Sequence, residues 1–384
     1  MSGTPSDGPH EATRDVLVRI ERELRELWSA DAVPGEPARS RVCTMNLVVV
    51  AGTRAIGEAY TAVVDEITLT TPARSIVVTM EPTAAGSLLD GDVTAVCSAE
   101  GPDLACSERV RLRATGAACA RVGSAVDALL VPEIPTSLVW LGRVHPGDPV
   151  FRELAQDAQR VLLDTDYTSL ASLLTLARWA REDASRPAVA DLAWTRLSTW
   201  QELTARFFDD PRHRPLAQSV DAVRIMQASD PGARLGSEGA LFIGWLATRL
   251  GLHLDRLGGA LRLRRADGAP VQLELRAVPR PVTVAPLALA GLTLTASLAG
   301  AHLRGEIERE LGSGRETDAS PDADVLRWRL TPIEGATVEQ RVRLGGNKSA
   351  RVLVRTLQRP AHDPLLVEAV AFAEQLFEDG VVCE

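Results

Sequence analysis

The sequence predicts an α/β protein. We expect a mixed, largely parallel sheet with flanking helices in its N-terminal part, followed by an α+β C-terminal part with an antiparallel sheet and a closing helix. Short apolar runs alternate with helical stretches up to about residue 165, which is typical of parallel strand–helix–strand units. From residue 260 onward, several segments alternate apolar and polar side chains, as in an antiparallel sheet with one covered face.

The length and composition allow more than one domain. The chain has 384 residues, of which 45% are hydrophobic and 24% are charged, and this balance is that of an ordinary globular protein. We expect an N-terminal amphipathic helix and linker over residues 1–40, an α/β domain over residues 41–165, and an α+β C-terminal domain over residues 166–384.

The N-terminal region is expected to contain one helix, from Arg14 to Trp28. Its apolar residues recur at helical spacing among arginines and glutamates, so one face of the helix must lie on another part of the protein. Residues 1–12 are expected to be a disordered tip. Prolines and a glycine over residues 31–37 indicate a linker.

The α/β domain is expected to begin with a parallel βαβ unit. The apolar strand Arg41–Ala51 precedes a helical stretch around residues 54–66 and a second strand, Ser75–Thr79. Strands near residues 92–100 and 104–113 flank a Gly-Pro-Asp turn and are expected to form a hairpin. The alternation then continues with a helix near 117–130, a strand at 137–141, a helix near 149–158 and a strand at 160–164.

The C-terminal domain is expected to mix helices and strands. Thr199 and Glu202 have the spacing of a capping box, which predicts a helix through Phe208. A helix over residues 240–251 is expected to end at a glycine, and the closing helix to begin at Asp363-Pro364. The other expected elements are a helix over 168–181, a strand over 217–228 and alternating strands over 260–355, such as Val271–Val278.

The composition argues against several classes of function. A formal net charge of −9 disfavours a nucleic-acid-binding protein, which needs an excess of cations. No apolar run is long enough to cross a membrane, and the first residues lack a signal-peptide pattern, so we expect a cytoplasmic protein. The five cysteines lack metal-binding spacing, so we expect no metal site.

No catalytic or cofactor motif is complete in the sequence. The segment Ala51–Gly57 has two glycines at the wrong interval for a dinucleotide fingerprint, although the helix that follows could hold an anion near Arg54. The segment Leu344–Ser349 lacks the first glycine of a phosphate loop. Because Arg-rich, strand-like segments flank it, we interpret it as a hairpin turn. We therefore expect no cofactor.

Cys97 and Cys106 lie on the two arms of the expected hairpin. If Gly101 and Pro102 form a two-residue turn, the two sulfurs face each other and could form a strained, easily reduced bridge. Proline prefers the first central position of a turn, however, and that register sets Cys97 against Glu108 instead. The two cysteines are thus a candidate redox pair, or simply two small buried residues.

The segment from Ala190 to Leu203 is the most informative part of the sequence. Trp194, Arg196 and Trp200 are the residue types that dominate protein–protein interfaces, because they bury large rigid surfaces around a fork of hydrogen-bond donors. These three residues are therefore candidates for binding a partner. The alternative is that both tryptophans pack into the core and that Arg196 pairs with Asp191.

This tryptophan segment, followed by Phe207-Phe208-Asp209, closely resembles the signature of the glucose-6-phosphate dehydrogenase assembly protein family, known as OpcA. The resemblance is strongest over residues 40–255. One departure is Thr71 before Pro72, where relatives usually have histidine. Further blocks agree in the same order: Arg41–Val50, Thr71–Val78, Cys106–Glu108, Leu129–Pro135 and Gly244–Leu250.

The resemblance implies a non-catalytic assembly factor or allosteric activator without a cofactor of its own. Such a protein binds glucose-6-phosphate dehydrogenase, the enzyme that opens the oxidative pentose phosphate pathway, and favours its active oligomer. In some relatives cysteines make this partnership redox-sensitive. The alternative, from a different class, is a sugar-phosphate or nucleotide-binding α/β enzyme, with Arg54 and Arg74 holding a phosphate at strand ends.

Overall fold

The computed structural model describes residues 9–29, 39–98, 104–257, 260–280, 284–310, 325–344, 349–378 and 380. The N-terminal tip up to residue 8, the linker and the hairpin turn at residues 101–103 lie outside the described residues. The chain divides into two compact units. Unit 1 comprises residues 1–168, 175–191 and 349–362, and unit 2 comprises residues 169–174, 192–348 and 363–384.

Unit 1 is built on a sheet that has eight strands among the described residues, in the order β1-β5-β3-β2-β6-β7-β8, with β4 paired to β5. All pairs are parallel except the antiparallel pair β4–β5. The strands are β1 (Arg39–Arg41), β2 (Met45–Ala51), β3 (Ala73–Glu81), β4 (Ser87–Ser98), β5 (Leu104–Gly116), β6 (Thr136–Leu141), β7 (Arg160–Leu163) and β8 (Ala188–Asp191).

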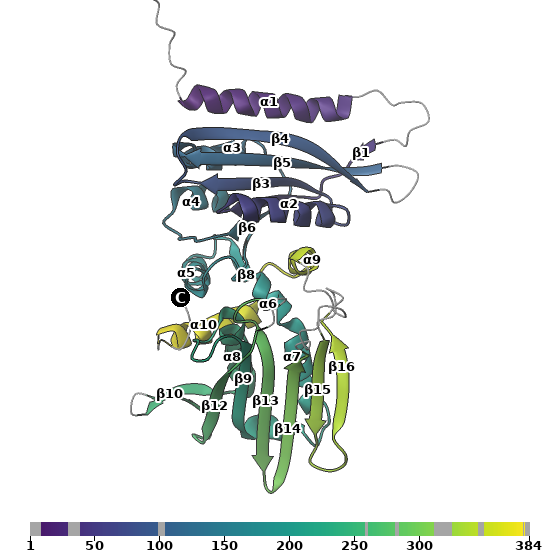
Figure 1. Cartoon of the computed structure of the whole chain (residues 1–384), viewed down its shortest axis with the longest axis vertical. Helices are drawn as coiled ribbons and strands as arrows, with labels where there is room; N and C mark the ends of the chain where they lie inside the picture. Colours follow the sequence, from purple (N-terminus) through teal and green to yellow (C-terminus); the bar gives the residue numbers. More distant parts are fainter. Residues whose placement is uncertain are drawn as a thin grey trace, which may run out of the picture. The chain divides into compact units, whose positions relative to one another are not determined.

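Helices accompany this sheet, and α1 lies along β4 (Figure 1). Gly91 of β4 permits that close approach, because a Cβ atom at this position would lie 3.0 Å from Cδ1 of Ile20. The helices are α1 (Pro9–Ser29), α2 (Arg54–Thr68), η1 (Ala117–Arg121), α3 (Val122–Asp127), α4 (Pro149–Gln156), α9 (Ser349–Gln358) and α5 (Leu170–Arg181), which contains a division between the units.

Local sequence explains the central βαβ unit. The strand β2 is an almost fully buried apolar run, as expected for a parallel strand covered on both faces. The Thr53 side chain accepts a hydrogen bond from the Ile56 amide and so caps α2. Register places Val48 between Ile76 and Leu138. The predicted parallel βαβ unit and the β4–β5 hairpin are both confirmed.

Unit 1 also includes a helix from near the end of the chain. Arg160 at the start of β7 donates from Nη1 to the carbonyl oxygens of Thr356, Leu357 and Arg359, at 3.3, 3.3 and 3.0 Å. These carbonyls belong to the end of α9 and the residue after it, where a cation is favourable. Burial lowers the pKa of Arg160. The contact fixes α9 to the parallel sheet.

Unit 2 holds a mixed sheet that has eight strands among the described residues, in the order β10-β11-β12-β9-β13-β14-β15-β16. The β9–β12 pair is parallel and the other pairs are antiparallel. The strands are β9 (Val220–Ala228), β10 (His253–Leu257), β11 (Ala260–Arg264), β12 (Pro270–Val278), β13 (Leu289–Leu298), β14 (Ala301–Arg309), β15 (Val325–Thr331) and β16 (Val338–Arg343).

The helices of unit 2 pack on one another and on this sheet. Gly244 of α8 lies so close to the Ala369 carbonyl of α10 that a Cβ atom would clash with it. Gly251 ends α8 in the left-handed conformation, with φ 64°, and the Asp363 carboxylate accepts from the Leu365 and Leu366 amides to start α10. The helices are α6 (Leu192–Arg196), α7 (Ser198–Ala205), η2 (Arg206–Phe208), η3 (Arg214–Ser219), α8 (Ser237–Leu250) and α10 (Pro364–Glu378).

The predicted fold class is confirmed: a parallel N-terminal sheet with helices, then a second sheet with a closing helix. Two local predictions are wrong. The predicted capping box fails because α7 already begins at Ser198, so Thr199 lies inside the helix. The predicted hairpin turn at residues 345–348 lies outside the described residues. The segment that follows it, Ser349–Gln358, is the helix α9 rather than a strand, because Val352, Leu353 and Thr356 are buried at helical spacing.

Candidate functional site at the amino end of the parallel sheet

A row of polar side chains crosses four neighbouring strands near their amino ends. Register pairs Glu108 with Arg74, Arg74 with Asn46, and Asn46 with Thr136. Paired residues of parallel strands point to the same face of the sheet. All four side chains are buried in a sheet whose other positions are largely apolar, so each must find a hydrogen-bond partner.

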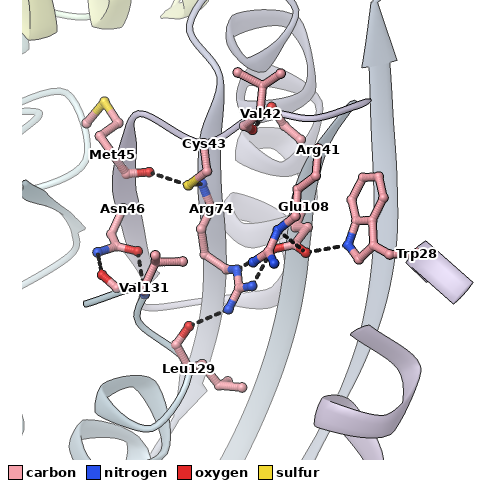
Figure 2. Close-up of polar contacts among 11 residues, drawn as sticks. Trp28, Arg41, Val42, Cys43, Met45, Asn46, Arg74, Glu108, Leu129 and Val131 are labelled. Atoms are coloured by element: carbon pink, nitrogen blue, oxygen red, sulfur yellow. Dashed lines mark hydrogen bonds and ion pairs between the residues drawn. The ribbon is translucent and has the colours of Figure 1, made fainter. Parts of the chain in front are cut away.

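Glu108, at the β5 end of this row, has partners from three other elements. Arg74 donates from Nε to Oε2 at 2.5 Å, and Arg41 lies 3.0 Å from Oε1 and 3.2 Å from Oε2. The indole Nε1 of Trp28 donates to Oε1 at 2.5 Å (Figure 2). Only 2% of the Glu108 side chain is exposed. One buried carboxylate thus connects α1, β1 and β3 to β5.

The same row holds the loop that precedes β6. Arg74 donates from Nη1 to the Leu129 carbonyl at 2.8 Å. The Asn46 amide donates to the Val131 carbonyl at 2.9 Å and accepts from the Val131 amide at 3.0 Å (Figure 2). The Sγ atom of Cys43 accepts a hydrogen bond from the Arg74 backbone amide at 3.1 Å. Four separate segments of the chain therefore meet around Arg74.

This arrangement suits a structural role better than proton transfer. Donors from Trp28, Arg41 and Arg74 hold both carboxylate oxygens of Glu108, and its low exposure leaves little access for a substrate. A buried carboxylate with charged partners is instead costly to disturb, because removing one partner leaves a charge without compensation. We interpret the Glu108 network, defined as Trp28, Arg41, Arg74 and Glu108, as a lock that joins α1 to the sheet.

The structure buries the three predicted partner-binding residues. Trp194, Arg196 and Trp200 have exposed fractions of 3%, 9% and 1%. The indole of Trp194 donates to Asp363 Oδ2 at 2.8 Å, and Arg196 lies 3.3 Å from Glu238. In this structure their side chains connect helices of unit 2. Their part in binding a partner stays a prediction. Because the three side chains are buried, we expect a partner to contact other, exposed side chains directly.

Neighbouring aromatic residues extend this packing. Trp200 contacts Phe242 of α8 in an edge-to-face arrangement at 6.5 Å between ring centroids. Phe207 stacks on Trp328 of β15 at 5.6 Å, and the Trp328 indole donates to the Leu203 carbonyl at 2.8 Å. The tryptophan segment therefore fastens α6, α7 and η2 to α8 and to the sheet of unit 2.

Cys97 and Cys106 pair directly across the β4–β5 hairpin and form a disulfide. The register in which the two sulfurs face each other is thus the one present, and the register that sets Cys97 against Glu108 is wrong. Cys106 is fully buried and lies two residues before Glu108 on the same strand. A redox role for the pair stays a prediction.

The proposed phosphate site of the enzyme alternative is not supported by the geometry. Arg54 follows the carboxyl end of β2, whereas Arg74 lies at the amino end of β3, which runs parallel to β2. A strand of seven residues separates these two edges by about 20 Å. Arg54 pairs with Glu58 and Arg74 with Glu108, so the two arginines cannot hold one phosphate.

The described residues contain no group of three or more histidine, cysteine, aspartate or glutamate side chains placed to hold a metal ion. Within the same ranges, no helix is both long enough and apolar enough to span a bilayer.

Sequence reasoning missed the Glu108 network. Arg41, Arg74 and Glu108 all lie in blocks that carried the family resemblance, but they are far apart in the sequence and nothing in their spacing links them. Trp28 was assigned only to the end of an amphipathic helix. The one available signal was the charged Glu108 inside an expected strand, because a buried carboxylate needs a cationic partner.

Fold and site together define a two-unit α/β protein whose buried polar row ties secondary-structure elements to one another. Comparison with protein families shows which family the chain belongs to. Residues 64–178 match the family described as glucose-6-phosphate dehydrogenase subunit N-terminal domain, and residues 187–370 match the corresponding C-terminal domain. The chain belongs to the OpcA family of glucose-6-phosphate dehydrogenase assembly proteins, which confirms the family resemblance.

Curated relatives agree with this assignment. A cyanobacterial protein of Nostoc punctiforme, provisionally named OxPP cycle protein OpcA, is 33% identical over 192 residues, which are 49% of this chain and 40% of that protein. A protein of the same name from Synechocystis sp. is 27% identical over 329 residues, which are 80% of this chain and 64% of that protein. This chain therefore spans less than two thirds of each of these relatives.

Solved structures give only a distant likeness. Biliverdin reductase from Synechocystis sp. is 12% identical, with a TM-score of 0.43, over 88% of this chain and 98% of that chain. An oxidoreductase from Sinorhizobium meliloti is 14% identical, with a TM-score of 0.42, over 88% of each chain. At these values the likeness carries no argument about function.

Proposed function

We propose that this protein is a non-catalytic assembly factor or allosteric activator that binds glucose-6-phosphate dehydrogenase and favours its active oligomer. It would thereby support the oxidative pentose phosphate pathway, in the cytoplasm. The observation that carries the proposal is the match of both regions of the chain to domains described as belonging to a glucose-6-phosphate dehydrogenase subunit. The name of the curated relatives, OxPP cycle protein, points in the same direction.

Only a modest binding energy is needed for such a function. An activator acts by binding the active conformation or oligomer of an enzyme more tightly than the inactive one. A tenfold shift in that equilibrium needs about 1.4 kcal/mol of differential affinity. A few side chains at an interface supply this amount, so no reacting group of the activator's own is required.

The architecture of the described residues supports a binding role. The Glu108 network and the tryptophan segment use their charged and aromatic side chains to hold helices on the two sheets. Trp194, Arg196 and Trp200 would then contribute to binding indirectly, by keeping the helices of unit 2 in place. The partner would contact other side chains.

Complex formation tests the proposal. Purified chain and glucose-6-phosphate dehydrogenase are mixed in defined ratios and analysed by size-exclusion chromatography with light scattering. We expect a complex that contains both proteins, together with a shift of the dehydrogenase toward its larger oligomer. A second sample contains the W200A chain, in which the helices of unit 2 should lose their packing. We expect no complex between this variant and the dehydrogenase. Separate elution of the two unmodified proteins at all ratios would remove the proposal.

The enzyme alternative makes a different prediction. Glucose 6-phosphate, 6-phosphogluconate and NADP are added singly to the isolated chain, and its thermal unfolding is followed. A ligand that binds the folded state raises the unfolding temperature by mass action. We expect no change with any of the three compounds. A concentration-dependent rise with one of them would favour the alternative.

We also propose that the Cys97–Cys106 pair makes the partnership sensitive to redox state. Reduction would remove the covalent link between the end of β4 and β5, close to the Glu108 network. Mass spectrometry of the oxidised chain should find the peptide that contains both cysteines, and dithiol treatment should change the affinity for the dehydrogenase. An unchanged affinity, or no linked peptide, would contradict this part of the proposal.

A further inference from the structure

One face of the sheet in unit 2 is left without a helix in the described part of the chain. The helices α7 and α8 lie against the other face (Figure 1), and the short helix η3 contacts β13. That covered face carries buried apolar side chains, among them Val223, Leu292 and Trp328. The opposite face, which we call the open face, carries the polar residues that alternate with them.

Charged side chains form a row across the middle of the open face. Strand register aligns the row in the order Glu274, Arg224, Thr293, Glu306, Arg329 and Glu339, from β12 to β16. Arg224 lies 2.7 Å from Glu274, and Arg329 lies 3.6 Å from Glu306 and 2.9 Å from Glu339. The signs of the charges therefore alternate on each side of β13.

This row is complementary to itself. Thr293 on β13 is the midpoint of the five residues from Glu274 to Arg329: Arg224 on one side corresponds to Glu306 on the other, and Glu274 corresponds to Arg329. Glu339 on β16 has no counterpart in the row. A two-fold axis along β13 between two such faces exchanges the two sides and keeps the row aligned. Arg224 of each copy would then face Glu306 of the other, and Glu274 would face Arg329. Interfaces with two-fold symmetry require this kind of self-complementarity.

The centre of the open face is hollowed where the axis would pass. A trough of about 200 Å³ is lined by small side chains, Ala222, Thr293 and Thr295, and by the longer Arg224, Glu274 and Arg304. Small residues at the axis prevent a clash between identical side chains, which would meet there. The trough leaves room for the arginine side chains of an opposing copy.

The neighbouring row is less favourable but does not forbid the arrangement. The same axis sets Arg276 against Arg327, two side chains of the same sign. Arg327 already forms an ion pair with Glu308 of its own chain, so the repulsion is partly neutralised.

The area of the open face is sufficient for a specific dimer. Five strand spacings of about 4.8 Å and seven residues of about 3.3 Å give roughly 550 Å² for each copy, or about 1,100 Å² in total. Specific interfaces need about 1,000 Å² or more. A face of this size with paired charges suits a reversible dimer better than an obligate one, because obligate interfaces are more apolar.

We propose that the open face binds a second copy of this chain, with the two-fold axis along β13. This dimer goes beyond the proposed partnership with the dehydrogenase and does not depend on it, since its test uses the isolated chain. If the dehydrogenase instead binds the open face of a single chain, adding the dehydrogenase will dissociate the dimer. A chain that is monomeric by itself would overturn the proposal.

Sedimentation equilibrium of the full chain over a wide concentration range gives the first test. We expect a species of twice the chain mass of 41.2 kDa that dissociates on dilution. The variants R224E and E306R each place like charges opposite one another twice, once on each side of the axis. Each variant alone should therefore raise the dissociation constant at least about tenfold.

Mixing the two variants tests the geometry. In a mixed dimer of one R224E chain and one E306R chain, both contacts across the axis again join opposite charges. Changes to pairs within each chain are the same in the mixed and unmixed samples, so they cancel. We expect the mixture to dimerise at least tenfold more tightly than either variant alone.

Controls separate this result from a folding defect. The R22E chain changes a 62% exposed arginine on α1 of unit 1 and should dimerise like the unmodified chain. Thermal unfolding should show that R224E and E306R remain folded at the assay temperature. A wild-type chain that stays monomeric, single variants that dimerise normally, or a mixture without recovery would each overturn the proposal.

Discussion

Two arginines share one carboxylate in the Glu108 network, and their different burial predicts different energetic roles. Arg74 is 9% exposed at its side chain and Arg41 is 46% exposed, while Glu108 is 2% exposed. The variants R74Q and R41Q each remove one positive charge from the same glutamate. R74Q leaves Glu108 buried with only the half-exposed Arg41 as a cation, whereas R41Q leaves the buried pair intact.

The magnitudes follow from this difference in burial. Removing one partner of a buried ion pair costs about 3–5 kcal/mol, whereas an exposed pair contributes about 0.2–1 kcal/mol. We therefore expect R74Q to lower the free energy of unfolding by about 3 kcal/mol more than R41Q does. The double variant R74Q/E108Q should cost less than R74Q alone, because two amides leave no uncompensated charge.

Hydrogen exchange measured on peptides from β3 and β5 is the suitable assay, because it reports on unit 1 separately from unit 2. Urea denaturation followed by circular dichroism provides a second estimate of the same free energies. The interpretation of Glu108 as the buried centre of a structural ion-pair network would be refuted by either of two results. One is an equal loss of unfolding free energy in R74Q and R41Q. The other is a double variant that is less stable than R74Q.

Three further predictions concern single residues. G305A should lower the urea midpoint by an amount equivalent to about 1–3 kcal/mol, because a Cβ atom there would lie 2.5 Å from ring atoms of Phe207; a midpoint equal to wild type would contradict this packing. W194F removes the indole donor to Asp363 and should cost about 1.5–3 kcal/mol, with faster hydrogen exchange at the start of α10; unchanged exchange there would be inconsistent with the contact. Burial raises the pKa of the Cys119 thiol, so iodoacetamide should modify it more slowly than the half-buried Cys43, and the reverse order would be evidence against its burial.

Local sequence patterns were sufficient to predict much of the fold. The apolar run of β2, the glycine after α8 and the Asp363-Pro364 start of α10 are each determined by a few neighbouring residues. The helix α9 was misread, because arginines interspersed with valine and leucine fit a strand as well as a helix over so few residues. The two-residue period of a strand and the 3.6-residue period of a helix can be told apart only over longer segments.

The candidate site depended on contacts that local patterns do not encode. Trp28 and Glu108 are 80 positions apart in the sequence, and they meet only because α1 packs on the edge of the sheet. Trp194 and Trp200 illustrate a second limit, because large aromatic residues dominate both interfaces and cores. Their composition could not distinguish the two, and the packing of α8 and α10 decided it.

The activity of glucose-6-phosphate dehydrogenase, measured as this chain is titrated in, tests the central claim most directly. Glucose 6-phosphate-dependent reduction of NADP is followed at a fixed concentration of the dehydrogenase. The account predicts a rise that saturates at a fixed ratio of the two proteins, with no turnover by the chain alone. A flat titration, or NADP reduction by the chain without the dehydrogenase, would contradict it.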